Sequence, residues 1–288
     1  MRFLKKLSKR IGLICVIASV FFLTACESEA VPSKIVSENA SGFTYELSKN
    51  DIRTSCQEPV EINLSEVEES LVLKDAGEYL ISGELNGSII IDVEDQNVHL
   101  FFDGINIKSK RGPAFIVQSA GKVFITVVEG TENTLSDSPN YDREKEENAC
   151  IYSLCDLTIN GSGKLLVSGL YKDAIHCKDI LKVLCSDLKI QAKRDGLRGS
   201  DGVYLKSEDI LIETEGNGIR TTKTGKVGKG SIELAGGNVS IISGKYGLNS
   251  AGDLRIYNSL CYLNGILGNM MIVGEMKVDE GCLQNESL

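Results

Sequence analysis

Three short motifs lie 22 residues apart in the stretch from Tyr171 to Arg220: Lys172-Asp173-Ala174-Ile175, Arg194-Asp195-Gly196-Leu197 and Gly216-Asn217-Gly218-Ile219. The apolar residue that ends each motif is followed by further apolar residues at the same steps. The pattern resumes after a seven-residue insertion at residues 224–230, and it extends back to Ile151 and forward to Leu263. Five copies at a near-constant spacing indicate a repeat architecture.

Each copy holds two or three short runs in which apolar and polar residues alternate, separated by Gly, Asp, Asn or Ser. Alternation with period two is typical of β-strands, and no segment has a long apolar stripe at helical spacing. A repeat of about 22 residues built only from short strands predicts an all-β chain of stacked rungs, a parallel β-helix. The L-x-x-L-x-L-x-x-N pattern of leucine-rich repeats is absent.

The N-terminus has the features of a secretory signal. Basic residues from Arg2 to Arg10 precede a short apolar run, Ile11–Ala25, which ends in Leu23-Thr24-Ala25-Cys26. This ending resembles the lipobox of bacterial lipoproteins, in which the cysteine is lipidated. We therefore expect a signal peptide at residues 1–25, lipidation of Cys26, a flexible tether over residues 26–40, and one β-helix domain over residues 41–288. Such a protein would be an extracytoplasmic lipoprotein at the cell surface, held to the membrane through its lipid anchor alone.

Net charge argues against a nucleic-acid partner. Removal of residues 1–25, with five basic and no acidic residues, leaves 26 Lys and Arg against 40 Asp and Glu, a formal charge of −14. Nucleic-acid binding favours basic surfaces. An anionic ligand would therefore need a local basic patch or a metal ion.

Cysteines do not suggest a disulfide framework. Of the nine in the sequence, seven remain once Cys15 is cleaved off and Cys26 is lipidated, and an odd number leaves at least one thiol unpaired. Most lie within the repeat pattern, where a cysteine acts as a small buried apolar residue.

The segments that flank the repeats are also organised around short strands. Residues 43–128 are rich in strand patterns punctuated by glycine. The polar, largely acidic residues 131–148 are expected to leave the coil as an excursion. Residues 265–288 are less regular and are expected to complete and cap the final rung.

The chain resembles the bacterial cell-surface family of carbohydrate-binding-domain-containing proteins between Phe43 and Ile256. The segments that carry this resemblance are Gly77-Glu78-Tyr79-Leu80-Ile81-Ser82-Gly83, Phe102-Asp103-Gly104-Ile105-Asn106-Ile107, Glu129-Gly130-Thr131-Glu132-Asn133-Thr134-Leu135 and Asp156-Leu157-Thr158-Ile159-Asn160-Gly161-Ser162-Gly163. The resemblance implies a right-handed parallel β-helix like that of pectate lyases. It also implies calcium bound at the turns and a polysaccharide ligand.

Two sets of polar residues recur at the turns and could bind calcium. Equal offsets become neighbours about 4.8 Å apart in the stack, so Asp173, Asp195 and Asn217 would form one column. Asp179 and Asp201 would form a second row. Carboxylate, amide and carbonyl oxygens are calcium ligands. The alternative is that these side chains accept hydrogen bonds from backbone N–H groups and cap the turns.

A further column lies one residue beyond the apolar markers and should point outward. It contains Tyr152, His176, Arg198, Arg220 and Asn249. His176, Arg198 and Arg220 could bind the carboxylates of an acidic polysaccharide, or could form ion pairs between rungs. Tyr171 and Tyr246, at the turns, could stack on sugar rings or simply pack.

Three functions are consistent with these features. The first is a surface protein that binds a polysaccharide, acidic and calcium-assisted, without cleaving it. The second is a calcium-dependent, pectate-type lyase, which needs a base beside a uronate carboxylate. Lys172, Lys178, Arg194 or Arg198 could serve, but nothing singles one out. The third is a structural surface protein that has no glycan ligand.

Overall fold

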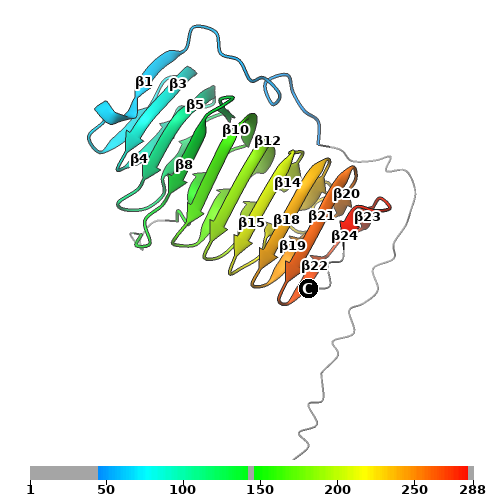
Figure 1. The fold of residues 1–288 in the computed structure, drawn as a ribbon. Helices are drawn as coiled ribbons and strands as arrows, with labels where there is room; N and C mark the ends of the chain where they lie inside the picture. Colours follow the sequence, from blue (N-terminus) through cyan, green and yellow to red (C-terminus); the bar gives the residue numbers. More distant parts are fainter. Residues whose placement is uncertain (1–44, 142–145, 285–288) are drawn as a thin grey trace, which may run out of the picture. The chain divides into compact units, whose positions relative to one another are not determined.

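Short strands stacked in two parallel sheets make up almost all of the described chain (Figure 1). The computed structural model describes residues 45–141 and 146–284. The predicted signal peptide, tether and lipidated Cys26 lie outside these residues. Within them the only helix is a 3-10 turn, η1 (Leu64–Glu66), so no helix there could cross a membrane.

The first sheet has nine strands, one for each successive rung. In stacking order these are β2 (Ser70–Leu73), β4 (Ser88–Asp92), β6 (Phe115–Ser119), β9 (Ala149–Ser153), β11 (Asp173–Cys177), β13 (Leu197–Gly199), β16 (Ile219–Thr221), β19 (Tyr246–Ser250) and β22 (Gly268–Ile272). We call it the nine-stranded sheet.

The second sheet has fifteen strands in two halves. One half contains β1 (Val60–Asn63), β3 (Gly77–Leu85), β5 (Asn97–Lys108), β7 (Lys122–Val127), β10 (Leu157–Gly169), β12 (Ile180–Ala192), β14 (Gly202–Leu205), β17 (Ser231–Leu234), β20 (Leu254–Ile256) and β23 (Met276–Val278). The other half is formed by the second parts of β3, β5, β10 and β12 together with β8 (Glu132–Ser136), β15 (Asp209–Thr214), β18 (Gly237–Ser243), β21 (Ser259–Gly265) and β24 (Leu283–Gln284). We call these the first and second halves of the fifteen-stranded sheet.

Corners between the two halves depend on glycine. In β10 the pairing register shifts between Gly161 and Lys164. Gly161 has φ +102°, and a Cβ atom there would lie 2.2 Å from the carbonyl oxygen of Val127 on the preceding rung. Only glycine can take this conformation so close to a neighbouring backbone.

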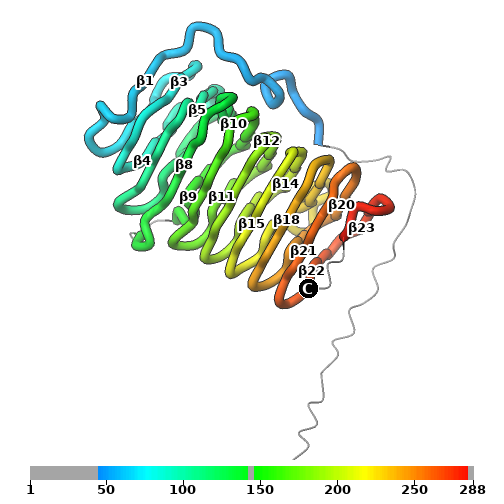
Figure 2. The backbone as a smooth tube through the Cα atoms, in the orientation of Figure 1, coloured from blue at the N-terminus to red at the C-terminus, as the bar shows by residue number. Residues whose placement is uncertain are grey.

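The apolar markers form the predicted inward column. Ile175 pairs with Leu197, and Leu197 pairs with Ile219, in parallel register. All three side chains are fully buried in the core cluster. The smooth trace in Figure 2 shows the successive coils that bring these positions together. The prediction of a stack of parallel strands around one apolar core is therefore confirmed.

The prediction that residues 131–148 leave the coil as one excursion is wrong. Glu132–Ser136 form β8, which pairs with both β5 and β10. The segment was misread because its polar Asn133 is buried. Its side-chain oxygen accepts hydrogen bonds from the backbone N–H groups of Gly104 and Ile105, each at 3.0 Å. The segment that leaves the coil begins only at Asp137. The chain after Gly265 continues the stack as β22 to β24.

The core predicts a strong effect of a charge at its centre. Leu197→Asp should lower the free energy of unfolding by about 3 kcal/mol or more, because it removes buried apolar contacts and places a carboxylate in the core. Chemical denaturation followed by circular dichroism measures this loss. Ile242→Asp is the matched control, because Ile242 lies in β18 with 51% of its surface exposed. Equal stability of the two variants would contradict the inward placement of Leu197.

Candidate functional site

The turn before the nine-stranded sheet carries a ladder of hydrogen bonds from rung to rung. Asp173 Oδ1 accepts from the backbone N–H of Asp195 at 3.0 Å, and Asp195 Oδ1 accepts from that of Asn217, also at 3.0 Å. The Asn217 side-chain amide donates to Asp195 at 2.7 Å, and its oxygen accepts from Asn249 at 3.2 Å. The predicted column therefore exists, and each member caps the rung that follows it.

Arg194 neutralises the first carboxylate of the ladder. Its Nε and Nη2 donate to the two oxygens of Asp173, each at 2.6 Å, in the bidentate geometry that suits a guanidinium. Asp173 is fully buried, and its carboxylate holds the pKa of Arg194 above its usual range. Arg194, which directly precedes Asp195 in the sequence, is thus the ion-pair partner of Asp173 on the preceding rung.

In the second predicted row, lysines neutralise the carboxylate of Asp201. Asp201 is 2% exposed and forms ion pairs with Lys223 at 3.0 Å and with Lys229. Both lysines flank or belong to the insertion at residues 224–230. Asp179 is half-buried, and burial together with the charges of Asp156 and Asp201 raises the pKa of its carboxyl.

The outward column exists, but its members differ in exposure. Tyr152, His176, Arg198 and Arg220 pair in register along β9, β11, β13 and β16. His176 is 1% exposed, and its Nδ1 lies 2.7 Å from the side-chain oxygen of Asn148. Burial and the charge of Arg198 lower the pKa of His176 to about 3, so the ring is neutral near pH 7. The accessible cations of the column are the two arginines.

Arg198 and Arg220 keep most of their hydrogen-bonding capacity. Arg198 Nη1 lies 3.7 Å from Asp173, whose oxygens are already held by Arg194, and Arg220 Nη1 lies 3.3 Å from Asp195. Their side chains are 20% and 37% exposed. Since a guanidinium has five N–H donors, both residues can accept another anionic partner.

The two predicted tyrosines lie at opposite ends of the column. Tyr171 stacks on Tyr141 with ring centroids 4.3 Å apart, and Lys172 Nζ lies 4.6 Å from the Tyr171 ring. Tyr246 begins β19 and lies against Gly268 of the next rung. Both are half-buried and retain an exposed edge.

A segment that leaves the coil at Asp137 covers the near end of this column. Asp137 accepts hydrogen bonds from the Tyr141 hydroxyl at 2.7 Å and from the Leu170 N–H at 2.5 Å. The Tyr141 hydroxyl also lies 2.8 Å from the carbonyl oxygen of Ala149. Tyr152 is 2% exposed, and its hydroxyl has no hydrogen-bond partner among the described residues.

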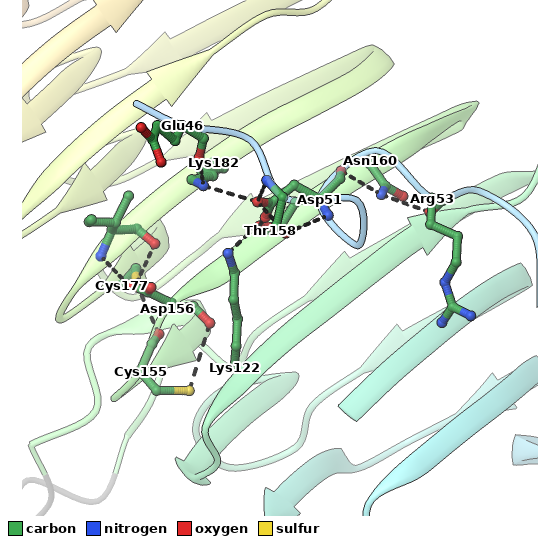
Figure 3. A network of polar contacts seen from close by, with 12 residues as sticks. Glu46, Asp51, Arg53, Lys122, Cys155, Asp156, Thr158, Asn160, Cys177 and Lys182 are labelled. Atoms are coloured by element: carbon green, nitrogen blue, oxygen red, sulfur yellow. Dashed lines mark hydrogen bonds and ion pairs between the residues drawn. The ribbon is translucent and has the colours of Figure 1, made fainter. Parts of the chain in front are cut away.

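A second covered surface was not foreseen from the sequence. Residues 45–57, which we call the strap, run across the first half of the fifteen-stranded sheet and cross its strands (Figure 1). Asp51, at the centre of the strap, is fully buried. It is held by Lys122 Nζ at 2.7 Å, Lys182 Nζ at 3.0 Å and the Thr158 hydroxyl at 2.6 Å, from three successive strands (Figure 3). These bonds hold the pKa of Asp51 well below its usual range, against the effect of burial.

The strap is also fixed along its length. Asn160 donates to the backbone oxygens of Asp51 and Arg53 at 2.9 and 3.0 Å (Figure 3). Arg53 pairs with Glu78 on β3 at 2.5 Å, and the Tyr45 hydroxyl reaches the carbonyl oxygen of Ser231 on β17 at 3.2 Å. A signal for this cover was present in the sequence, since the outward positions of β10 and β12 hold Thr158, Asn160 and Lys182.

Comparison with known proteins agrees with this architecture. The family model of the carbohydrate-binding domain-containing proteins matches residues 67–270. A protein of that description from Acetivibrio thermocellus is 30% identical over 226 residues, which cover 76% of this chain and 79% of the relative. A solved structure, the polysaccharide lyase-like protein from C. thermocellum in a gadolinium derivative, matches with a TM-score of 0.74 and 26% identity. That match covers 78% of this chain and 98% of the other.

Fold and comparisons together define an all-β protein of stacked parallel strands, of the kind seen in the polysaccharide lyase-like relative. The chain belongs to the carbohydrate-binding domain-containing protein family.

The predicted calcium ligands do not fit a calcium ion as they are arranged. Both oxygens of Asp173 are taken by Arg194, and both oxygens of Asp201 are taken by lysines. Among the described residues, no group of three or more His, Cys, Asp or Glu side chains is placed to hold a metal.

We expect the calcium prediction to be decided by thermal melting. Because the protein's own cations hold the carboxylates, added calcium should leave the melting temperature of the full chain unchanged. Asp195→Ala should lower that temperature equally with calcium and with chelator, through loss of the ladder bonds. A ligand that binds only the native state raises the melting temperature. A calcium-dependent rise that Asp195→Ala removes would instead establish an ion in the column.

The buried Asp137 predicts a pH-dependent stability. Burial raises its pKa to about 6, above the usual value of about 3.9. The folded protein therefore favours the protonated form. The contribution of Asp137 to the free energy of unfolding is about 3 kcal/mol. It is fully present below about pH 4 and is lost as the pH rises through 6. Denaturation midpoints measured between about pH 4.5 and 7.5 should therefore contain a contribution from Asp137 that falls with rising pH, opposed by the buried His99 and His176, whose lowered pKa values favour the folded state more as the pH rises.

Asp137→Asn is the test of this assignment, because the amide still accepts hydrogen bonds but does not titrate. Because only the parent carries the Asp137 contribution, the stability of the parent relative to this variant should fall as the pH rises over the same range. Asp209→Asn, an exposed carboxylate in β15, serves as the control and should follow the parent protein. Parallel curves for the parent and Asp137→Asn would show that Asp137 is not the titrating group.

Proposed function

We propose that the protein is a lipid-anchored, extracytoplasmic protein that binds an acidic polysaccharide at the cell surface and does not cleave it. Membership of a carbohydrate-binding family supports a glycan ligand. The predicted signal peptide and Cys26 support a location outside the cytoplasm. We also propose, from the family resemblance, that the stack is right-handed with rungs of about 22 residues.

One observation carries the choice of an acidic ligand. Arg198 and Arg220 pair directly across neighbouring strands, and each guanidinium keeps donors that no carboxylate of the described residues satisfies at short range. Neighbouring strands lie about 4.8 Å apart, so the two cations form a short row. A guanidinium binds a carboxylate with two parallel hydrogen bonds, which suits the uronates of an acidic polymer.

The remaining residues of the site are assigned to the same surface. Asp173, Asp195 and Asn217 hold the turns that position the arginines, and Asp179 and Asp201 continue the polar edge. His176 lies beneath the surface beside Arg198. Tyr246 borders the row and is available to stack on a sugar ring, whereas Tyr171 is stacked on Tyr141 and lies under Lys172. Calcium assistance, which the family resemblance implies, is not part of this proposal, because the protein's own cations hold Asp173 and Asp201.

A polysaccharide lyase is the second candidate, because a solved relative is described as polysaccharide lyase-like. Such a reaction needs a base to remove a proton beside the uronate carboxylate. Arg194 is committed to Asp173, and Lys172 lies over the Tyr171 ring. Among the described residues, Lys178 and Arg198 are not engaged in this way, so we propose binding without cleavage and use the absorbance experiment below to distinguish it from cleavage. A purely structural surface protein would bind no glycan and is distinguished by the same experiment.

The double variant Arg198→Ala plus Arg220→Ala should bind polygalacturonate at least about tenfold more weakly than the parent protein, since it loses both bidentate cations. Binding by the parent should weaken as salt is added, because the contacts are ionic. Affinity electrophoresis or calorimetry with the full chain gives both results. Lys189→Ala plus Lys226→Ala is the control, as it removes two exposed cations elsewhere.

Three results would contradict the proposal. A steady rise in unsaturated-uronate absorbance during incubation would identify a lyase. Equal weakening by the two double variants would indicate a general charge effect instead of a site at Arg198 and Arg220. Absence of binding to any acidic or neutral polysaccharide would favour the structural protein.

A further inference from the structure

A cleft of about 570 Å³ lies beside the strap, on a different face from the arginine row. One wall is the strap itself, with Leu47, Ile52 and Thr54. The other wall is the corner between the two halves of the fifteen-stranded sheet. Its volume lies within the range of about 300–1,000 Å³ that is typical of small-ligand sites.

The cleft runs along the stack. Its corner wall is formed by residues from four successive rungs, which follow one another at Ser162, Ser186, Lys206 and Gly237. Three rung spacings of about 4.8 Å give a length of about 14 Å. This shape suits a short linear molecule that lies across the rungs.

The two walls differ in chemistry. Ile52 is 61% exposed although it is large and apolar, and with Leu47 and Leu184 it forms an apolar side. The corner residues Ser162, Ser186, Lys206 and Glu208 contribute polar groups to the lining. A sugar chain has the matching character, because its rings present C–H faces on one side and hydroxyl groups at their edges.

Charge distinguishes this cleft from the arginine row. Lys206 and Glu208 are the charged residues among those that line it, and their formal charges cancel. A polyanion would gain no net electrostatic attraction here. Lys206 can donate hydrogen bonds and Glu208 can accept them, which suits the hydroxyl groups of an uncharged sugar.

Three glycines, Gly161, Gly236 and Gly237, belong to the corner wall of the cleft. Gly237 has φ +81°, and a Cβ atom there would lie 1.4 Å from the carbonyl oxygen of Ser207. Gly161 is constrained in the same way. Gly161 and Gly237 are therefore required by the close approach of neighbouring rungs at the corner, and they fix the shape of this wall of the cleft.

We propose that this cleft is a second carbohydrate site, which takes a short neutral oligosaccharide between the strap and the corner. The site exists only while the strap is docked, because the strap supplies one wall. Asp51 is therefore a positioning residue: it does not line the cleft, but its ion pairs with Lys122 and Lys182 hold Leu47 and Ile52 in place. The proposal goes beyond the arginine row and does not depend on it.

The test titrates the full chain with neutral linear tetrasaccharides of glucose, mannose and xylose, with trigalacturonate as the charged comparison. At least one neutral tetrasaccharide should bind. Ile52→Asp should weaken that binding about tenfold or more, because it removes the apolar contact. Lys206→Ala plus Glu208→Ala should do the same without a change in net charge. Ile266→Asp is the matched control, since Ile266 is 80% exposed and lies outside the cleft.

Two further variants separate the possible explanations. Asp51→Asn should weaken neutral-sugar binding although its side chain does not reach the cleft, and unchanged binding would overturn the role of the strap. Arg198→Ala plus Arg220→Ala should leave neutral-sugar binding unchanged while it weakens trigalacturonate binding. The proposal is overturned if none of the three tetrasaccharides binds, or if the cleft variants bind like the parent. It is also overturned if the arginine variant abolishes neutral-sugar binding.

Discussion

Parallel pairing between successive rungs is the constraint on which the rest of the molecule depends. Because each strand pairs with the equivalent strand of the next rung, a residue's offset within the rung decides its column and the face it occupies. A slip of one residue would turn the whole apolar set of a strand toward solvent. The fully buried Ile175, Leu197 and Ile219 hold this register from the inside. The bonds from Asp173 and Asp195 to the next rung's N–H groups hold it at the turn.

A stack of this kind leaves three outward surfaces, and two of them are covered in different ways here. The nine-stranded sheet carries the arginine row, and its near end is covered by the segment that starts at Asp137. The first half of the fifteen-stranded sheet is covered by the strap. The burial of Asp51 is tolerated because two lysines and a threonine reach it from three strands. Removal of one partner of a buried ion pair typically costs about 3–5 kcal/mol, so the strap and the sheet beneath it are energetically linked.

Much of the fold could be predicted from the sequence, because the information was local. The repeated offsets identified the inward column, and the turn motifs identified the column of Asp173, Asp195 and Asn217. The docking of the strap could not be predicted in this way. Asp51 and Lys182 are 131 residues apart, and no periodic pattern connects them. The strand β8 was missed for a related reason, since its buried Asn133 is polar and satisfied by backbone groups of the rung below.

The residues of the candidate site were predicted from the sequence, but the ion pairs that each of them forms were not. All of the basic residues near the turns looked equivalent in the sequence. The structure commits Arg194 to Asp173 and makes His176 neutral by burial, which leaves Arg198 and Arg220 as the accessible cations. Sequence patterns show which residues share a column. They do not show which carboxylate each cation reaches, because that depends on side-chain geometry at the turn.

Net charge adds a last consideration for the proposed acidic ligand. The chain has a formal charge of −9, or −14 if residues 1–25 are removed as predicted, and so repels a polyanion at a distance, whereas the arginine row is proposed to attract it at contact. At physiological ionic strength the screening length is about 8 Å, so the distant repulsion is largely suppressed and the contact attraction persists. Once the distant repulsion is screened, further salt weakens mainly the contact attraction, so binding falls as salt is added. The matched pair of charge variants then isolates the contribution of the row.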